Sequence, residues 1–115
     1  MRDVLHVYDL FDLVDYQLHH FNHVQGQTFN AGGGISSNIS LQELTKLCAE
    51  VCGHSVQEER VQETRHGDIP VYIADNTKLE QSTGWRPKRA VTNIIEDTFQ
   101  WIHNNELQLS KILNT

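Results

Sequence analysis

The sequence is poor in basic residues and has no long apolar run. Nine Lys and Arg stand against 15 Asp and Glu, so the formal net charge is -6. Nucleic-acid backbones and anionic membranes are bound by basic faces, which argues against both as partners. No apolar run has the length of a transmembrane span, and the N-terminus lacks the pattern of a secretory signal. We therefore expect a cytoplasmic protein.

The sequence also lacks the glycine patterns that bind dinucleotides. Neither G-x-x-G-x-x-G nor G-x-G-x-x-G occurs, and the cluster Gly32 to Gly34 is far from the spacing that opens a dinucleotide-binding helix. Backbone amides of this cluster could approach a ligand, but a turn that requires positive φ explains it as well. We expect no cofactor in this chain.

Cysteine is scarce. Cys48 and Cys52 are four residues apart on a predicted helix, a spacing that brings them near each other but does not suit a disulfide. Buried, reduced thiols are the expected state, and a metal or redox pair is the alternative.

Hydrophobic periodicity predicts four helices. The first runs from about Asp9, its N-cap, to His23. A capping box of Ser40 and Glu43 opens the second, which ends at Gly53. The others are a short helix from Asn76 to about Thr83, capped by Asp75 and closed by Gly84, and an amphipathic helix through Val91, Ile94, Ile95, Phe99 and Ile102.

Short strands are expected between the helices. The segments are an extended start from Asp3 to Val7 and strands at residues 28–30, 56–61 and 71–74. No internal repeat or long linker occurs, and 38% of the residues are hydrophobic. We therefore expect one small α+β domain over residues 1–115, with a modest core.

The most informative stretch runs from Arg65 to Asp75. It places Arg65 and Asp68 three residues apart around a glycine turn, directly before a short apolar strand. A guanidinium suits phosphate, and a carboxylate accepts hydrogen bonds from paired ribose hydroxyls. Such a pair can hold a nucleotide at two points, although on chemistry alone a surface turn is the commoner explanation.

Five motifs follow one another along the chain. They are Arg2 to Leu10 (R-D-x-x-H-V-x-D-L), Gln27 to Gly34 (F-N-x-G-G-G), Ser40 to Leu44, Arg65 to Asp75 (R-x-G-D-x-P-x-Y-x-A-D), and Gly84 to Pro87 with a helix containing Trp101 and Ile102. Together they resemble the C-terminal, substrate-binding portion of the extended short-chain dehydrogenase/reductases, the NAD-dependent nucleotide-sugar epimerases and dehydratases. Within the family, the residues of these motifs are most similar to those of CDP-paratose (CDP-tyvelose) epimerases.

The resemblance implies a site for a nucleotide-diphosphate sugar. Matching the family's motifs gives Arg2 and Arg65 for the phosphates, Asp68 for the ribose and Tyr72 near the sugar. Tyr72 can equally be a half-buried strand aromatic, and Arg2 can be frayed at the chain end.

The family's chemistry uses residues that are not in this sequence. Its NAD-binding half and its proton-transfer couple, a tyrosine followed four residues later by a lysine, belong to the part that would precede Met1. No tyrosine here has a lysine at that distance. The resemblance thus implies a substrate-binding portion that is inactive alone, with NAD in the full-length family and a separate NAD-binding half as a partner. The alternative is a non-catalytic binding or interaction module that associates with itself as a homodimer.

Two histidine features have competing explanations. His19 and His23 have the helical spacing of zinc ligands, but a solvated polar face is the alternative because no third ligand follows at a recognisable interval. His6 lies at the histidine of R-D-x-x-H, where a structural hydrogen bond is expected rather than catalysis.

Overall fold

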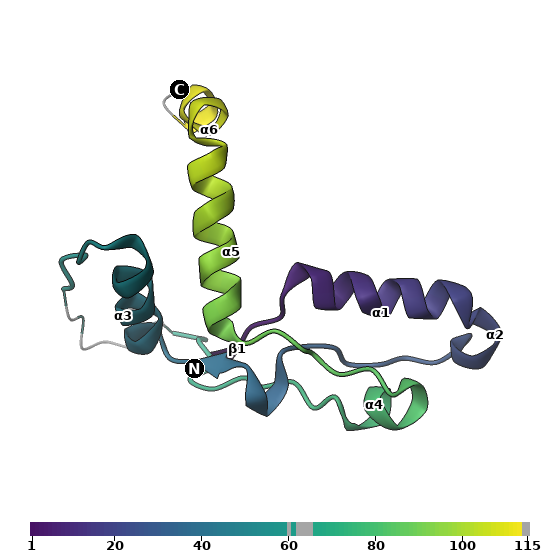
Figure 1. The fold of residues 1–115 in the computed structure, drawn as a ribbon. Helices are drawn as coiled ribbons and strands as arrows, with labels where there is room; N and C mark the ends of the chain where they lie inside the picture. Colours follow the sequence, from purple (N-terminus) through teal and green to yellow (C-terminus); the bar gives the residue numbers. More distant parts are fainter. Residues whose placement is uncertain (60, 62–65, 114–115) are drawn as a thin grey trace.

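The computed structural model describes residues 1–59, 61 and 66–113 (Figure 1). Its helices are α1 (Val7–His19), α2 (Phe21–Val24), α3 (Leu41–Cys52), α4 (Thr77–Thr83), α5 (Val91–Asn104) and α6 (Glu106–Leu113), with a 3-10 helix η1 (Gly34–Ser36) and strands β1 (Arg2–Asp3) and β2 (Asn38–Ile39). The predicted α+β class is confirmed, with helices dominating.

The helices differ from the prediction at their boundaries. The expected helix over residues 9–23 begins two residues earlier and is divided at His20, whose backbone (φ -122°, ψ 33°) leaves the helical region. Asp9 is not its N-cap: the His6 ring accepts the hydrogen bond from Tyr8 N–H instead. The chain beyond Asn104 forms α6. The division at His20 and the additional helix α6 explain why the structure has more helices than the four expected.

The predicted ends of the second and third helices are confirmed. Ser40 and Glu43 form a reciprocal capping box at the start of α3, and Gly53 ends that helix at φ 74°. Gly84 ends α4 at φ 72°. Both glycines occupy the left-handed region that L side chains disfavour. At the start of α4, Asn76 is the N-cap residue, while the Asp75 carboxylate accepts the Thr77 N–H at 2.9 Å.

Most of the predicted strands are wrong. Residues 28–30 form no strand, and neither do the described residues of the 56–61 segment. The 71–74 segment contributes one parallel bridge, from Tyr72 to Arg2. Propensity alone does not supply a pairing partner, and among the described residues the pairings that form all involve β1. It pairs antiparallel with β2 in the register Arg2 to Ile39 and Asp3 to Asn38.

The triple glycine is set by close packing as well as by backbone conformation. A Cβ on Gly33 would lie 2.1 Å from the Val4 carbonyl oxygen, and one on Gly32 would lie 2.4 Å from Asp3 Oδ2. Gly34 alone has a positive φ, at 65°. The positive-φ explanation therefore holds for Gly34, whereas Gly32 and Gly33 let this loop lie against the first strand.

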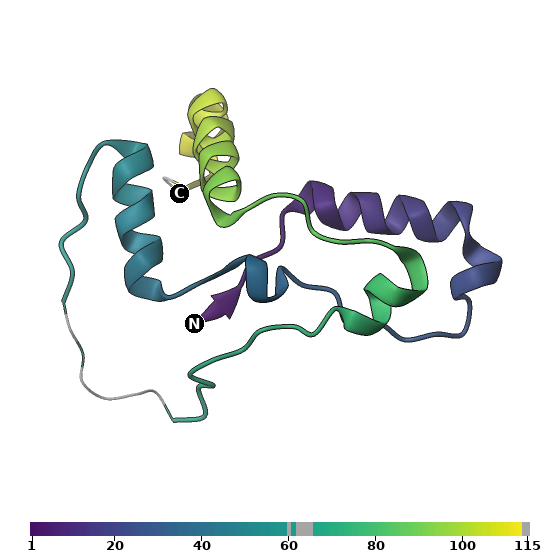
Figure 2. The ribbon, with the colours of Figure 1, turned by 60° about the horizontal axis from the view of Figure 1, so that its bottom comes forward.

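The core is small. Leu13, Leu79 and Trp85 form its buried cluster, against which Leu5 and Phe29 pack. It lies where α1, α4 and the segment leading to α5 meet, and Figures 1 and 2 both show that segment passing between α4 and α1. Cys48 and Cys52 lie on α3, unpaired and half-buried rather than buried.

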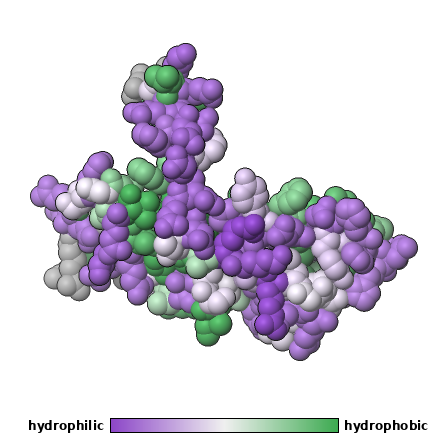
Figure 3. Space-filling view, in the orientation of Figure 1, coloured by the Kyte–Doolittle hydropathy of each residue, from purple (hydrophilic) through white to green (hydrophobic). Residues whose placement is uncertain are grey.

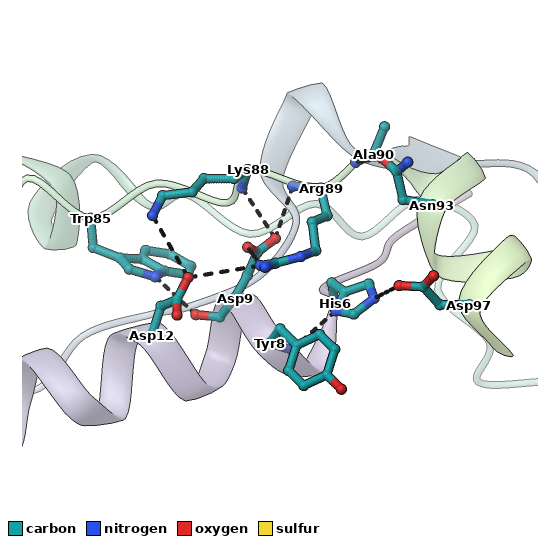
Figure 4. A network of polar contacts seen from close by, with 10 residues as sticks. All are labelled: His6, Tyr8, Asp9, Asp12, Trp85, Lys88, Arg89, Ala90, Asn93 and Asp97. Carbon is teal, nitrogen blue, oxygen red and sulfur yellow. Dashed lines mark hydrogen bonds and ion pairs between the residues drawn. The ribbon is translucent and has the colours of Figure 1, made fainter. Parts of the chain in front are cut away.

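A buried carboxylate joins α1 to the segment before α5 (Figure 4). Asp9 is 1% exposed. Its Oδ2 accepts the backbone N–H groups of Lys88 (3.1 Å) and Arg89 (3.0 Å), and its Oδ1 accepts Arg89 Nη1–H at 2.6 Å. The Asp9 carbonyl accepts the Trp85 indole N–H at 2.9 Å. The charge is thus fully paired by donors, as a buried carboxylate requires.

The molecule is open rather than compact. Its radius of gyration is 17.5 Å, against about 13 Å for a compact domain of about this size. In Figure 1, α5 and α6 stand away from the body, and α5 contacts α3 as well as His6 at the start of α1. Figure 3 shows apolar residues gathered between α3 and the base of α5. Among the described helices, none combines the length and the apolar character needed to cross a membrane.

We expect Asp9→Ala to lower the free energy of unfolding by about 3 kcal/mol, because it leaves half-buried N–H groups and the Arg89 guanidinium without their acceptor. Urea unfolding followed by circular dichroism measures it. The matched control is Asp15→Ala on the same helix, whose carboxylate is exposed and pairs only with His19 at 3.5 Å; it should change stability by less than about 0.5 kcal/mol. Equal losses would show that the Asp9 network does not hold α1.

Candidate functional site

A groove of about 300 Å³ lies beside the first strand. It is lined by Arg2 of β1, by Ser40 and Leu44 at the start of α3, and by the loop residues Asp68 to Pro70. The groove therefore brings together three segments that are far apart in the sequence, and two of the predicted site residues are among them.

Arg2 and Asp68 meet at this groove. Arg2 Nη2 donates to Asp68 Oδ1 at 2.9 Å, across 66 residues of sequence, and Arg2 Nη1 donates to the Met1 carbonyl at 2.9 Å. The two side chains remain 46% and 54% exposed. These bonds hold Arg2 at the groove in the structure. An exposed pair of this kind adds little stability, so a ligand that offers both groups better partners can replace it at low cost.

Backbone hydrogen bonds hold the Asp68 loop in place. The Met1 nitrogen donates to the Pro70 carbonyl at 2.7 Å, Tyr72 N–H donates to the Met1 carbonyl at 3.1 Å, and Asp3 N–H donates to the Tyr72 carbonyl at 3.2 Å. The loop turns at Gly67, whose φ of 84° suits glycine. These bonds hold the segment that follows Asp68 beside the first residues of the chain.

The other two predicted residues have different outcomes. Tyr72 is 55% exposed, so it is more open than a half-buried strand aromatic. In the described part of the chain it is not among the residues that line the groove. Arg65 falls outside the described residues, so its role stays a prediction.

His6 has the structural role that was predicted for it. The ring is 4% exposed. Its Nδ1 faces the Tyr8 N–H at 3.0 Å and must be the acceptor there, so Nε2 carries the proton and donates to Asp97 Oδ2 at 3.0 Å. The imidazole thereby caps α1 and fastens it to α5 (Figure 4).

His19 and His23 do not meet as metal ligands. His19 Nδ1 bonds the Asp15 carbonyl at 2.9 Å, while His23 Nε2 bonds the Ser82 carbonyl at 2.8 Å. Within residues 1–59, 61 and 66–113 no cluster of three His, Cys, Asp or Glu side chains has the arrangement of a metal site. Each of the two rings uses one nitrogen in a bond to a backbone carbonyl.

Asp3 is a residue of this region that sequence reasoning did not single out. Its Oδ2 accepts the Gly34 N–H at 2.9 Å and the Ala74 N–H at 3.1 Å. The signal in the sequence is its place as the aspartate of the R-D-x-x-H motif. Its importance comes from two loops that arrive from distant parts of the chain.

Hydrogen bonds also stabilise the charged form of two carboxylates, Glu43 and Asp75. The Ser40 hydroxyl and backbone N–H lower the pKa of Glu43 below its ordinary value. The hydroxyl and backbone N–H of Thr77 do the same to the pKa of Asp75. Both groups are therefore ionised at neutral pH, and Glu43 keeps a negative charge at the start of α3.

The chain is similar to several curated proteins over most of its length. No family model matches the chain. The chain is 31% identical over 101 residues to CDP-paratose 2-epimerase of Salmonella typhi. This match covers 88% of the chain and 30% of that protein. The chain is 31% identical over 106 residues to UDP-glucose 4-epimerase of Neisseria gonorrhoeae (91% and 30%), and 30% identical over 112 residues to the probable GDP-L-fucose synthase 1 of Oryza sativa subsp. japonica (96% and 32%).

The predicted relationship to the NAD-dependent nucleotide-sugar epimerase family is confirmed. The likeness extends over most of this chain. The chain nevertheless spans only about a third of the length of these curated relatives.

We expect the contribution of Glu43 to the stability of α3 to depend on pH. The pKa of Glu43 is lowered in the folded chain, so its contribution is present above the ordinary value of 4.5 and is lost as the pH falls through the lower folded value. The difference in thermal midpoint between the native chain and Glu43→Ala, measured from pH 7 to pH 3, should shrink over that range. Glu50→Ala, which removes an exposed partner of Lys46 at 3.9 Å, is the control; a Glu43 difference that stays constant would contradict the capping role.

Proposed function

We propose that this chain is the substrate-binding portion of a nucleotide-sugar epimerase and holds the nucleotide diphosphate at the Arg2 and Asp68 groove. The observation that carries the proposal is the meeting of these two side chains at 2.9 Å from positions 66 residues apart. They are also the residues that the family's motifs assign to phosphate and ribose. The relatives' names support a nucleotide sugar as the ligand.

The chemistry of the groove suits such a ligand. The Arg2 guanidinium offers a planar set of donors to the phosphates, and the Asp68 carboxylate accepts hydrogen bonds from the ribose hydroxyls. Binding separates the ion pair but gives each group a new partner. Because both are about half exposed, little stability is lost. Arg65, three residues before Asp68, supplies a second guanidinium in this proposal.

The chain alone does not carry out the isomerisation in this proposal. The family's proton-transfer tyrosine and lysine and its NAD-binding half have no counterpart in these 115 residues. The residues present would bind and orient the substrate. The hydride acceptor and the proton-transfer groups would be supplied by an NAD-binding half, which is the partner that this proposal requires.

We expect the purified chain to bind CDP, UDP or their sugar conjugates with a dissociation constant in the micromolar range or tighter, as measured by calorimetry. Each of Arg2→Ala, Arg65→Ala and Asp68→Ala should weaken binding by about tenfold or more, since each removes a charge-assisted hydrogen bond. Lys46→Ala is the matched control, because it removes an exposed cation of an ion pair on α3. Absence of binding to every nucleotide, or equal effects of the control, would contradict the site.

One observation favours a second function, in which the chain is a non-catalytic module that associates with itself. Along α1 and α2 an apolar row recurs at alternating intervals of four and three residues, the spacing of a helix-packing seam. Its members are Val7 (69% exposed), Phe11 (63%), Val14 (45%), Leu18 (71%) and Phe21 (62%). Asp9 and Leu13 occupy the opposite, buried face. An antiparallel copy would set Val7 against Phe21, Phe11 close to Leu18 and Val14 against itself, so the two rows would contact each other along their length.

If this second function holds, the chain is a dimer at micromolar concentration, and Phe11→Glu or Leu18→Glu makes it monomeric, because a charge in an apolar interface is not solvated. Sedimentation equilibrium measures the change. Ile35→Glu is the control, since Ile35 is 86% exposed and outside the row. A native monomer across this concentration range would rule out self-association.

A further inference from the structure

The nucleotide site proposed above depends on a weakly paired segment. Arg2 lies on β1, whereas Asp68 lies on a segment that joins the start of the chain through one parallel bridge, Arg2 to Tyr72, and through one bond from the Met1 nitrogen to the Pro70 carbonyl. So short a pairing specifies register poorly, and a slip of one residue turns every side chain to the opposite face. A further contact that fixes the register would therefore help Arg2 and Asp68 to meet.

We propose that Asp3 is the positioning residue of the nucleotide site: its carboxylate fixes the register of residues 68–74 on the first strand and so sets the separation of Arg2 and Asp68. Asp3 follows Arg2, and adjacent side chains of a strand point to opposite faces. Arg2 therefore faces the groove while Asp3 faces the glycine loop. This inference rests on the proposed function of the groove.

The carboxylate joins three segments through one oxygen. Asp3 Oδ2 accepts the Ala74 N–H at 3.1 Å and the Gly34 N–H at 2.9 Å. The Asp3 backbone N–H donates to the Tyr72 carbonyl at 3.2 Å. Asp3 thus bonds the same segment two residues apart, at Tyr72 and Ala74, which is the spacing that a slipped register would break.

The surroundings are shaped around this carboxylate. A Cβ at Gly32 would lie 2.4 Å from Asp3 Oδ2 and 2.6 Å from the Ala74 Cβ, so glycine leaves the room that the carboxylate occupies. Asn76 completes the junction, with its amide exchanging two hydrogen bonds with the Gly32 backbone at 3.1 and 2.9 Å. The glycine loop and the 74–76 segment therefore form one unit, and Asp3 connects that unit to β1.

Two kinds of variant separate positioning from stability. Asp3→Ala removes the acceptor of both N–H groups, whereas Asp3→Asn places an amide oxygen where it can accept both, since both bonds use one oxygen. Ser37→Ala is the matched control. The buried Ser37 hydroxyl donates to the Val4 carbonyl at 2.8 Å, so it joins the same loop region to the same end of the chain but makes no bond to residues 68–74.

The experiment measures nucleotide affinity by calorimetry together with the thermal midpoint. We expect Asp3→Ala to weaken CDP or UDP binding by about tenfold or more, Asp3→Asn to stay within about threefold of the native chain, and Ser37→Ala to lower the midpoint while leaving affinity unchanged. Amide hydrogen exchange should accelerate at Gly34 and Ala74 in Asp3→Ala and not in Asp3→Asn. If Asp3→Ala does not fold, Asp3→Ser takes its place; its side chain is one bond too short to reach the two amides, so the same loss of affinity is expected.

The outcomes distinguish this inference from the proposed function. A native chain that binds no nucleotide overturns both. A native chain that binds, with Asp3→Ala binding equally well or with Ser37→Ala losing as much affinity, leaves the nucleotide site standing and overturns the role of Asp3. Unchanged exchange of the Ala74 amide in Asp3→Ala also overturns it, whatever the affinities.

Discussion

The pairing of the Asp9 carboxylate is the interaction on which the arrangement of the helices depends. A buried charge is tolerated only when donors surround it, and here the donors come from the Lys88 and Arg89 backbone and the Arg89 side chain. They lie about 80 residues further along the chain, so satisfying this charge joins the first helix to the segment that leads into α5. The direction of α5 follows, since the helix begins at Val91, and the bond from His6 to Asp97 fastens the next turn of α5 to α1.

The first strand has the corresponding role at the site. Only two residues pair with β2, yet one side chain of this strand reaches Asp68 and the next reaches the glycine loop and Ala74. The groove and its structural support therefore lie on opposite faces of the same two residues. Such a site has few main-chain bonds of its own, which explains why side-chain acceptors and three glycines are needed to assemble it.

The apolar surface of the chain is large for its core. Among the described residues five hydrophobic side chains are buried, whereas large ones such as Phe11, Leu18 and Trp101 remain 58% to 71% exposed. Large contiguous apolar surface marks contact with another polypeptide. The chain also spans about a third of its curated relatives. Both proposed functions include a partner for this surface, a separate NAD-binding half in one and a second copy in the other.

The sequence by itself determined the features that depend on neighbouring residues. The capping box at Ser40, the helix ends at Gly53 and Gly84 and the amphipathic α5 were predicted because their causes lie within a few residues, and motif order alone indicated the family. Only the tertiary structure decided which segments would pair. Residues 28–30 have strand propensity but pair with no strand. His6 caps α1, while the Asp9 carboxylate bonds the backbone of Lys88 and Arg89 instead. Asp3 is important because the N–H groups of Gly34 and Ala74 both donate to it. Contacts between residues far apart in sequence leave no local pattern, and that is the physical reason why they could not be read from it.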